Sequence, residues 1–124
     1  MDHAVTWLSQ QHQIAPDKPF FLYVAPGTAH APHQAPKAWL QKFRGKFDAG
    51  WDVMREQSFA RQKAAGVIPA DAQLTPRAAE IPAWDSLSPD RKRVAARMME
   101  AYAAMLAHFD YQFGRVIKEI ERNG

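Results

Sequence analysis

The chain has 124 residues, of which 47% are hydrophobic, including four Trp and seven Phe, so it is long and apolar enough for one domain with a core. Its 16 basic and 13 acidic residues give a net charge of +3 without any basic run, and the sequence has no apolar stretch of about 18 residues, which argues against nucleic-acid binding and a membrane span. Because cysteine is absent, disulfides, thiolate metal sites and cysteine nucleophiles are excluded.

The first expected element is a helix at residues 2–13, with Asp2 as its N-cap. Residues 20–25 (FFLYVA) follow as an apolar run between Pro19 and Pro26, a pattern typical of a strand buried on both faces of a parallel sheet. One strand without neighbours would leave its backbone N–H and C=O groups unpaired. We therefore expect this chain to be an internal piece of a larger α/β protein that supplies the partner strands.

Three further helices are expected, separated by loops. A short one covers residues 37–43, and a longer one at residues 51–65 is closed by Gly66, a favoured left-handed C-cap. Residues 67–89 contain four prolines and predict a long irregular loop, which Trp84 should pack down onto the rest of the protein.

The last expected helix is the longest. Ser88 is a good N-cap, Pro89 suits the first helical position, and Asp90 lies at the positive end of the helix dipole. For Asp110 and Arg115 we favour an ion pair on the helix surface over a role in a site. Apolar residues recur at intervals of three or four and form one face: Val94, Met98, Tyr102, Met105, Phe109, Phe113, Val116 and Ile120.

The candidate site is the loop at residues 26–36, which carries His30 and His33. In open α/β sheets, ligands bind beyond the carboxyl ends of the strands, where this loop would lie. Its three prolines exclude the helix that would place both histidines on one face, and no carboxylate is near in sequence, so a metal site is not favoured. His30 is either an active-site donor or a structural residue, and for His33 we favour loop packing or a pocket rim. The other histidines are expected to be surface or packing residues: His3, His12 and His108.

Two long blocks of the chain resemble the sulfatase family, in the middle of the large catalytic domain of arylsulfatase-like enzymes. The first block is residues 18–76, from KPFFLYVAPGTAHAPHQAPKAW to ADAQLTP, and the second is residues 81–121, IPAWDSLSPDRKRVAARMMEAYAAMLAHFDYQFGRVIKEIE. The resemblance implies an α/β fold of the alkaline phosphatase type. Residues 1–124 would then be a partial catalytic domain with one central strand, several helices and a long loop, and the full-length protein would hydrolyse sulfuric esters.

Members of this family use a formylglycine, made from Cys or Ser in a C/S-x-P-x-R motif, beside a calcium held mainly by Asp and Asn. This sequence has neither that motif, nor the upstream Asp-Asp pair, nor the strand ending in Asp-Asn. We therefore expect calcium in the full-length enzyme but no metal ligand in this chain. What carries over is His30, which matches the family's substrate histidine and would donate to the sulfate or to its leaving oxygen. His33, on the same loop, is expected to border the bound substrate.

Sulfate ester cleavage needs a nucleophile, cationic groups around the sulfuryl oxygens and a donor for the leaving oxygen. His30 can supply only the donor, worth a factor of about 10² to 10⁴ in rate, so the chain alone is expected to be inactive. Its expected partners are a sulfate ester and the remainder of the sulfatase domain. Two alternatives stay open: a phosphoester or phosphonate hydrolase of the same superfamily, and a non-catalytic helical protein whose long apolar face binds a partner.

Overall fold

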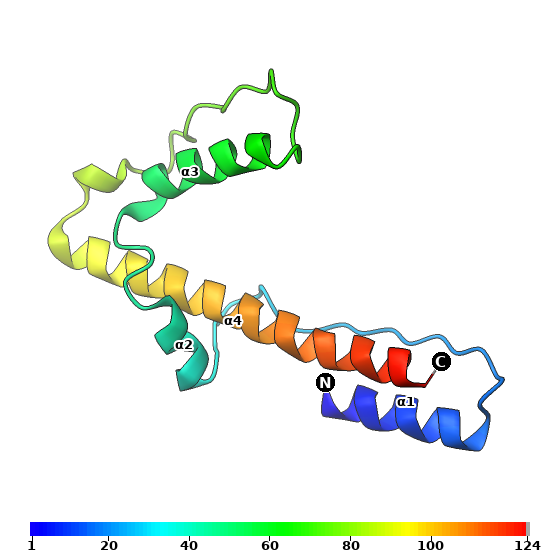
Figure 1. Cartoon of the computed structure of the whole chain (residues 1–124). Coiled ribbons are helices and arrows are strands. Elements are labelled where there is room, and N and C mark those ends of the chain that lie inside the picture. Colours follow the sequence, from blue (N-terminus) through cyan, green and yellow to red (C-terminus); the bar gives the residue numbers. More distant parts are fainter. Residues whose placement is uncertain (124) are drawn as a thin grey trace.

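The structure is a computed structural model that describes residues 1–123, and this part of the chain is helical. In Figure 1, the longest helix, α4 (Pro89–Arg122), runs through the whole molecule, and the other helices lie along its length. The bounds of the elements are α1 (Asp2–Ile14), α2 (Lys37–Phe43), α3 (Gly50–Ala64), the 3-10 helix η1 (Trp84–Ser86) and α4 (Pro89–Arg122). The predicted helices are therefore confirmed, with ends that differ by one or two residues. Within these residues, no helix is both long enough and apolar enough to cross a bilayer.

Helix α4 begins as the sequence predicts. The Ser88 hydroxyl accepts a hydrogen bond from the Arg91 N–H at 3.4 Å, and Pro89 occupies the first turn, where its missing N–H costs nothing. The predicted apolar face is only partly covered. Val116 is 2% exposed, whereas Val94 and Met98 are 60% and 61% exposed, so the first turns of α4 carry apolar surface that the described residues leave open.

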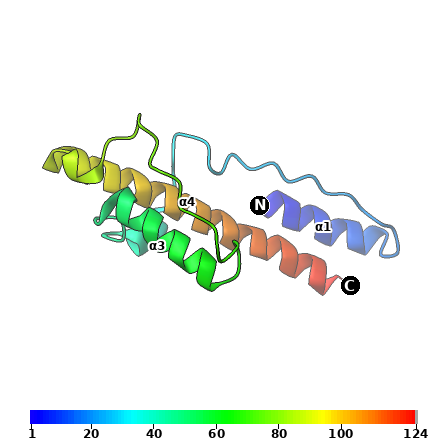
Figure 2. The same cartoon turned by 90° about the horizontal axis from the view of Figure 1, so that it is seen from above.

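Helix α1 packs along the C-terminal part of α4 and runs in the same direction (Figure 2). Leu8 is buried between them, and Asp2 forms an ion pair with Arg115 of α4 at 2.6 Å. That pairing replaces the ion pair predicted between Asp110 and Arg115. Met1, not Asp2, is the N-cap residue. The Asp2 carboxylate lies in the first turn and pairs with Arg115 instead of capping the helix.

The loop at residues 67–83, which we call the proline loop, is long and irregular, as the sequence predicts, and it folds back along α3 (Figure 1). The Asp52 carboxylate of α3 accepts hydrogen bonds from the Arg77 guanidinium at 2.9 Å and from the Trp84 N–H at 2.8 Å. Arg55 donates to the Thr75 hydroxyl at 2.7 Å. Trp84 is 6% exposed, so the loop ends on a buried aromatic anchor.

The turn between α2 and α3 is fixed to α4 by a buried carboxylate. Glu100, 5% exposed, accepts a hydrogen bond from the Gly45 N–H at 2.7 Å and forms an ion pair with Arg97 at 2.8 Å. Near the start of α2, the Trp39 ring packs on His108 of α4 at a centroid distance of 5.4 Å. The loop at residues 26–36 leads into α2, so these contacts place the end of that loop against the middle of α4.

The predicted central strand is not formed. Residues 20–25 run as a drawn-out segment past α1 and α4, and within residues 1–123 no backbone hydrogen bond joins them to another segment. Leu22 and Val24 are half-buried against the helices, while Phe21 and Tyr23 are 87% and 81% exposed. The physical reason is that a strand needs a second extended segment beside it, and the described residues supply helices there instead.

Candidate functional site

His30 lies in the loop at residues 26–36, which we call the His30 loop, and its ring is exposed. The ring Nδ1 is 2.6 Å from the carbonyl oxygen of Ala31. A carbonyl oxygen only accepts hydrogen bonds, so this contact assigns the proton of the neutral ring to Nδ1. Nε2 then carries the lone pair of the neutral ring.

The backbone of the His30 loop is tightly turned. The His30 N–H donates to the Gly27 carbonyl at 3.1 Å, and Ala29 adopts a positive φ of 77°. The peptide bond between Ala31 and Pro32 is cis. A non-glycine residue at positive φ is uncommon outside turns that need it, so the surrounding contacts hold the chain in this path around His30.

His33 has different surroundings from His30. Its ring is half-buried and meets the ring of Tyr102 of α4 edge to face, at a centroid distance of 5.0 Å. It also lines a cavity of about 500 Å³ between α3 and α4. The structure thus attaches His33 to the helical body and leaves His30 exposed on the loop.

The geometry of a metal site is not present around these histidines. Throughout residues 1–123, no three His, Asp or Glu side chains gather closely enough to hold a metal ion. Calcium takes six to eight oxygen ligands, most often from carboxylates and carbonyls, and the imidazoles of the His30 loop do not fit that set. The residues present therefore do not form a calcium site.

The start of the His30 loop borders a hollow of about 770 Å³ between the drawn-out segment and helices α1 and α4. His3 of α1 and His108 of α4 both line it, together with Thr28 and Gln34 of the loop. From sequence, both histidines were interpreted as surface or packing residues, and no local pattern links positions so far apart in the chain. His108 is held in packing contacts, since its Nε2 lies 3.1 Å from the Gln112 side chain and its ring meets Trp39.

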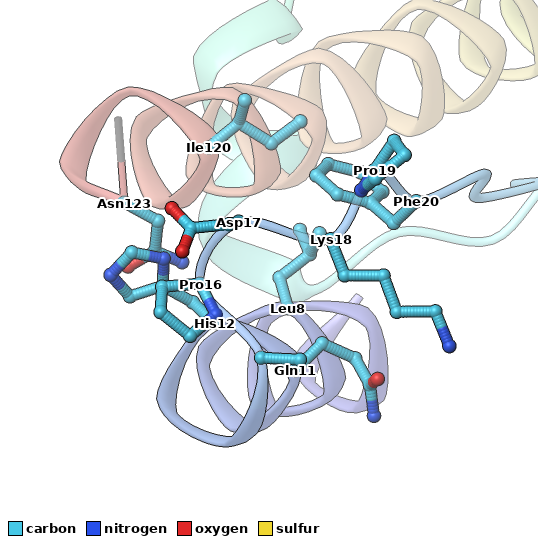
Figure 3. A pocket seen from close by; sticks show the side chains of 11 residues that line it. Leu8, Gln11, His12, Pro16, Asp17, Lys18, Pro19, Phe20, Ile120 and Asn123 are labelled. Atoms are coloured by element: carbon cyan, nitrogen blue, oxygen red, sulfur yellow. The ribbon is translucent and has the colours of Figure 1, made fainter.

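A further cavity lies at the other end of the drawn-out segment, where Phe20 is part of its lining (Figure 3). It has a volume of about 440 Å³ and is lined by the ends of α1 and α4 and by the turn that follows α1, with His12 and Asp17 on its wall. Leu8 and Ile120 form its apolar side, as Figure 3 shows. Nothing links this cavity to the candidate histidines, which lie on the far side of residues 20–25.

Known proteins similar to this chain are sulfatases. The chain is 33% identical over 108 residues to an arylsulfatase of Klebsiella aerogenes, which covers 87% of this chain and 23% of the relative. It is 37% identical over 106 residues to an uncharacterised sulfatase of Schizosaccharomyces pombe, which covers 85% of this chain and 19% of that relative. The chain thus spans about a fifth to a quarter of the length of these two relatives.

The family assignment extends over the whole sequence, since the Sulfatase family model matches residues 1–124. The family implies an alkaline phosphatase-like fold. The matched range includes the His30 loop, α3, the proline loop and α4. This chain belongs to the sulfatase family.

Proposed function

We propose that this chain is part of the catalytic domain of a sulfuric ester hydrolase and that His30 donates a hydrogen bond, and then a proton, to the oxygen that leaves sulfur. The observation that carries the proposal is the Nδ1 contact of His30 with the Ala31 carbonyl at 2.6 Å, which orients the ring and leaves Nε2 as the nitrogen that could reach a substrate. Family membership and the similarity to an arylsulfatase support it.

In this role, His30 acts in its imidazolium form. The Nδ1–H remains hydrogen-bonded to the Ala31 carbonyl while Nε2–H points at the leaving oxygen, so the bond keeps the ring in one orientation during proton transfer. As the sulfur–oxygen bond breaks, negative charge develops on that oxygen, and the Nε2 proton neutralises it. The tight turn around Ala29 limits the entropy lost when the donor is aimed.

The other parts of the chemistry lie outside these residues. A formylglycine nucleophile and a calcium that holds the sulfuryl oxygens would come from the rest of a sulfatase domain, of which this chain is a part. Residues 20–25 would then be its central strand, with partner strands along both edges and a covered outer face for Phe21 and Tyr23, which are exposed in this chain. His33, held by Tyr102, borders the substrate instead of reacting with it.

The test is an assay of the full natural protein with 4-nitrophenyl sulfate and 4-nitrophenyl phosphate in the presence of calcium. The expected result is sulfate ester turnover that far exceeds phosphate ester turnover. Faster hydrolysis of the phosphate would identify a phosphoester hydrolase of the same superfamily, and no hydrolysis of either ester would contradict the proposal.

A further inference from the structure

The His30 loop is not attached to the helices by its own hydrogen bonds. Within residues 1–123, the hydrogen bonds that residues 26–35 form stay inside the loop: the His30 N–H donates to the Gly27 carbonyl, and the His30 Nδ1 meets the Ala31 carbonyl. These bonds define the local shape of the loop but leave its position relative to α4 undetermined. That position therefore depends on packing contacts.

The contact that joins the loop directly to α4 is made by two aromatic rings. The His33 ring meets the Tyr102 ring edge to face, at a centroid distance of 5.0 Å and an interplanar angle of 78°. Both values are typical of a favourable pair of aromatic rings. In the described part of the chain, no hydrogen bond of the Tyr102 hydroxyl takes part, so the ring itself makes the contact.

Tyr102 lies in a firmly held part of α4. Two residues before it, Glu100 is 5% exposed and accepts a hydrogen bond from the Gly45 N–H at 2.7 Å. Two residues after it, Ala104 is completely buried. The backbone on both sides of Tyr102 is therefore fixed by packing, and the ring presents a stationary surface to His33.

The position of His33 affects the proposed donor through a short piece of backbone. His33 follows His30 by three residues, which span at most about 11 Å even when the chain is fully extended. The carbonyl that orients the His30 ring belongs to Ala31, between the two histidines. A shift of His33 therefore moves this carbonyl and the imidazole bonded to it. A displacement of about 1 Å is enough to cost roughly 100-fold in rate.

We propose that Tyr102 is a positioning residue for His30. By holding the ring of His33, it keeps the Ala31 carbonyl, and with it the His30 imidazole, in the place from which a proton reaches the leaving oxygen. This inference rests on the proposed function, because it requires His30 to be the proton donor. In this role Tyr102 contacts neither the substrate nor the reacting atoms, so its removal weakens proton donation without removing the donor.

The experiment uses the full natural protein and compares Tyr102→Ala with Tyr102→Phe, which keeps the ring. His33→Ala removes the same contact from the loop side and replaces Tyr102→Ala if that variant does not fold. The matched control is Phe113→Ala: Phe113 is as exposed as Tyr102, at 39%, and its ring stacks on Phe109 of its own helix. Tyr102→Ala is also combined with His30→Ala.

Each variant is assayed with phenyl sulfate and with 4-nitrophenyl sulfate. Phenol is the poorer leaving group, so cleavage of its ester depends more on a proton donor. Tyr102→Ala should lower kcat for phenyl sulfate about tenfold and for 4-nitrophenyl sulfate much less. Tyr102→Phe and Phe113→Ala should each change kcat by less than about twofold. In the His30→Ala background, Tyr102→Ala should cause no further loss, because the donor that it positions is absent.

Three results would overturn the inference: equal losses on the two esters, a further loss in the His30→Ala background, or a Tyr102→Phe variant as impaired as Tyr102→Ala. If the unaltered protein hydrolysed neither ester, the proposed function would fail instead. Hydrogen exchange of the His30 amide would then still report on the loop. Exchange should be faster in Tyr102→Ala than in Tyr102→Phe, and equal exchange would show that Tyr102 does not hold the loop.

Discussion

The backbone of Gly50 lies directly against the indole ring of Trp84. A Cβ atom built on Gly50 would overlap that ring, and Gly50 itself has a positive φ of 80°. Glycine is therefore required at this position for two reasons: the positive φ, and the close approach of the Trp84 ring to the backbone. The contact fixes the start of α3 against the end of the proline loop.

Replacing Gly50 by Ala should lower the free energy of unfolding by about 2 to 4 kcal/mol, because backbone strain and overpacking against Trp84 add together. Gly66→Ala is the matched control, since Gly66 has a similar φ of 67° but open space around the added Cβ. It should cost only about 1 kcal/mol. Urea unfolding followed by tryptophan fluorescence measures both, and equal losses in the two variants would show that the Trp84 contact is unimportant.

The docking of the proline loop should weaken in acid. Hydrogen bonds from the Trp84 N–H and then from Arg77 hold the pKa of Asp52 below its ordinary value. A carboxyl with a lowered pKa in the folded state contributes stability that is complete above its unfolded pKa, about 3.9, and is lost as pH falls through the folded pKa. Pepsin cleavage of the loop should therefore accelerate as pH falls below about 4.

Asp52→Asn isolates this effect, since the amide cannot be charged. At about pH 4, pepsin should already cleave the proline loop faster in Asp52→Asn than in the wild type. This difference in cleavage rate should shrink as pH falls, because the wild-type Asp52 carboxylate becomes protonated. Asp71→Asn, in the same loop but exposed, is the control and should behave like wild type. An Asp52→Asn variant with wild-type cleavage at every pH would contradict the role given to Asp52.

The buried carboxylate of Glu100 should be important for stability. Glu100→Ala leaves the Gly45 N–H and the Arg97 guanidinium without this acceptor, at a cost of about 1 to 3 kcal/mol. Glu100→Gln keeps an acceptor for Gly45 and should cost less. Glu121→Ala, at an exposed position of the same helix, should be nearly neutral, and thermal unfolding compares the three.

The two histidines of the loop should differ in the full natural protein. His30→Ala should lower kcat by about 10² to 10⁴ fold with little effect on folding, because an exposed donor needed in the transition state is removed. His33→Ala should lower kcat much less and raise KM, since its ring packs on Tyr102 beside the substrate. A kcat loss that is equal in both variants, or confined to His33→Ala, would reverse the assignment.

The chain alone should be inactive towards an aryl sulfate, because the nucleophile and the calcium ligands lie outside it.

Residues 20–25 of the isolated chain should exchange their amide hydrogens rapidly. No backbone partner protects those amides within residues 1–123. In the full natural protein the same amides should exchange at least a thousandfold more slowly if neighbouring strands pair with them. Slow exchange in the isolated chain would mean that partner strands are unnecessary, or that copies of the chain pair with one another, which size-exclusion chromatography would reveal.

Local signals predicted the helices well. Ser88 and Pro89 define the start of α4, and Gly66 ends α3 with a positive φ, because capping depends on residues close in sequence. The strand at residues 20–25 was predicted from the same kind of local signal and is not confirmed in this chain, since pairing depends on a distant segment. The partner of Arg115 was missed for a similar reason, as Asp2 lies at the opposite end of the sequence.

The candidate site was predictable only in part. The position of His30 follows from its place in the loop, but the Nδ1 contact that orients its ring depends on the local backbone path, which the sequence does not reveal. The cavity behind His33 joins residues of α3 and α4 that are about fifty positions apart, so no spacing rule could find it. Metal ligation was not favoured from sequence because no carboxylate lies near the loop.

Helix α4 also determines when the rest of the chain can fold. Helices α1, α2 and α3 all pack on it, yet its 34 residues are the last of these elements to be synthesised. At about 5 to 20 residues per second, the ribosome needs roughly 2 to 7 s to make α4 after Ser88. During that interval the three earlier helices exist without the surface that buries them, and short isolated helices are marginal in water. Until α4 emerges, the apolar faces that these helices bury against it therefore stay uncovered by it in the nascent chain.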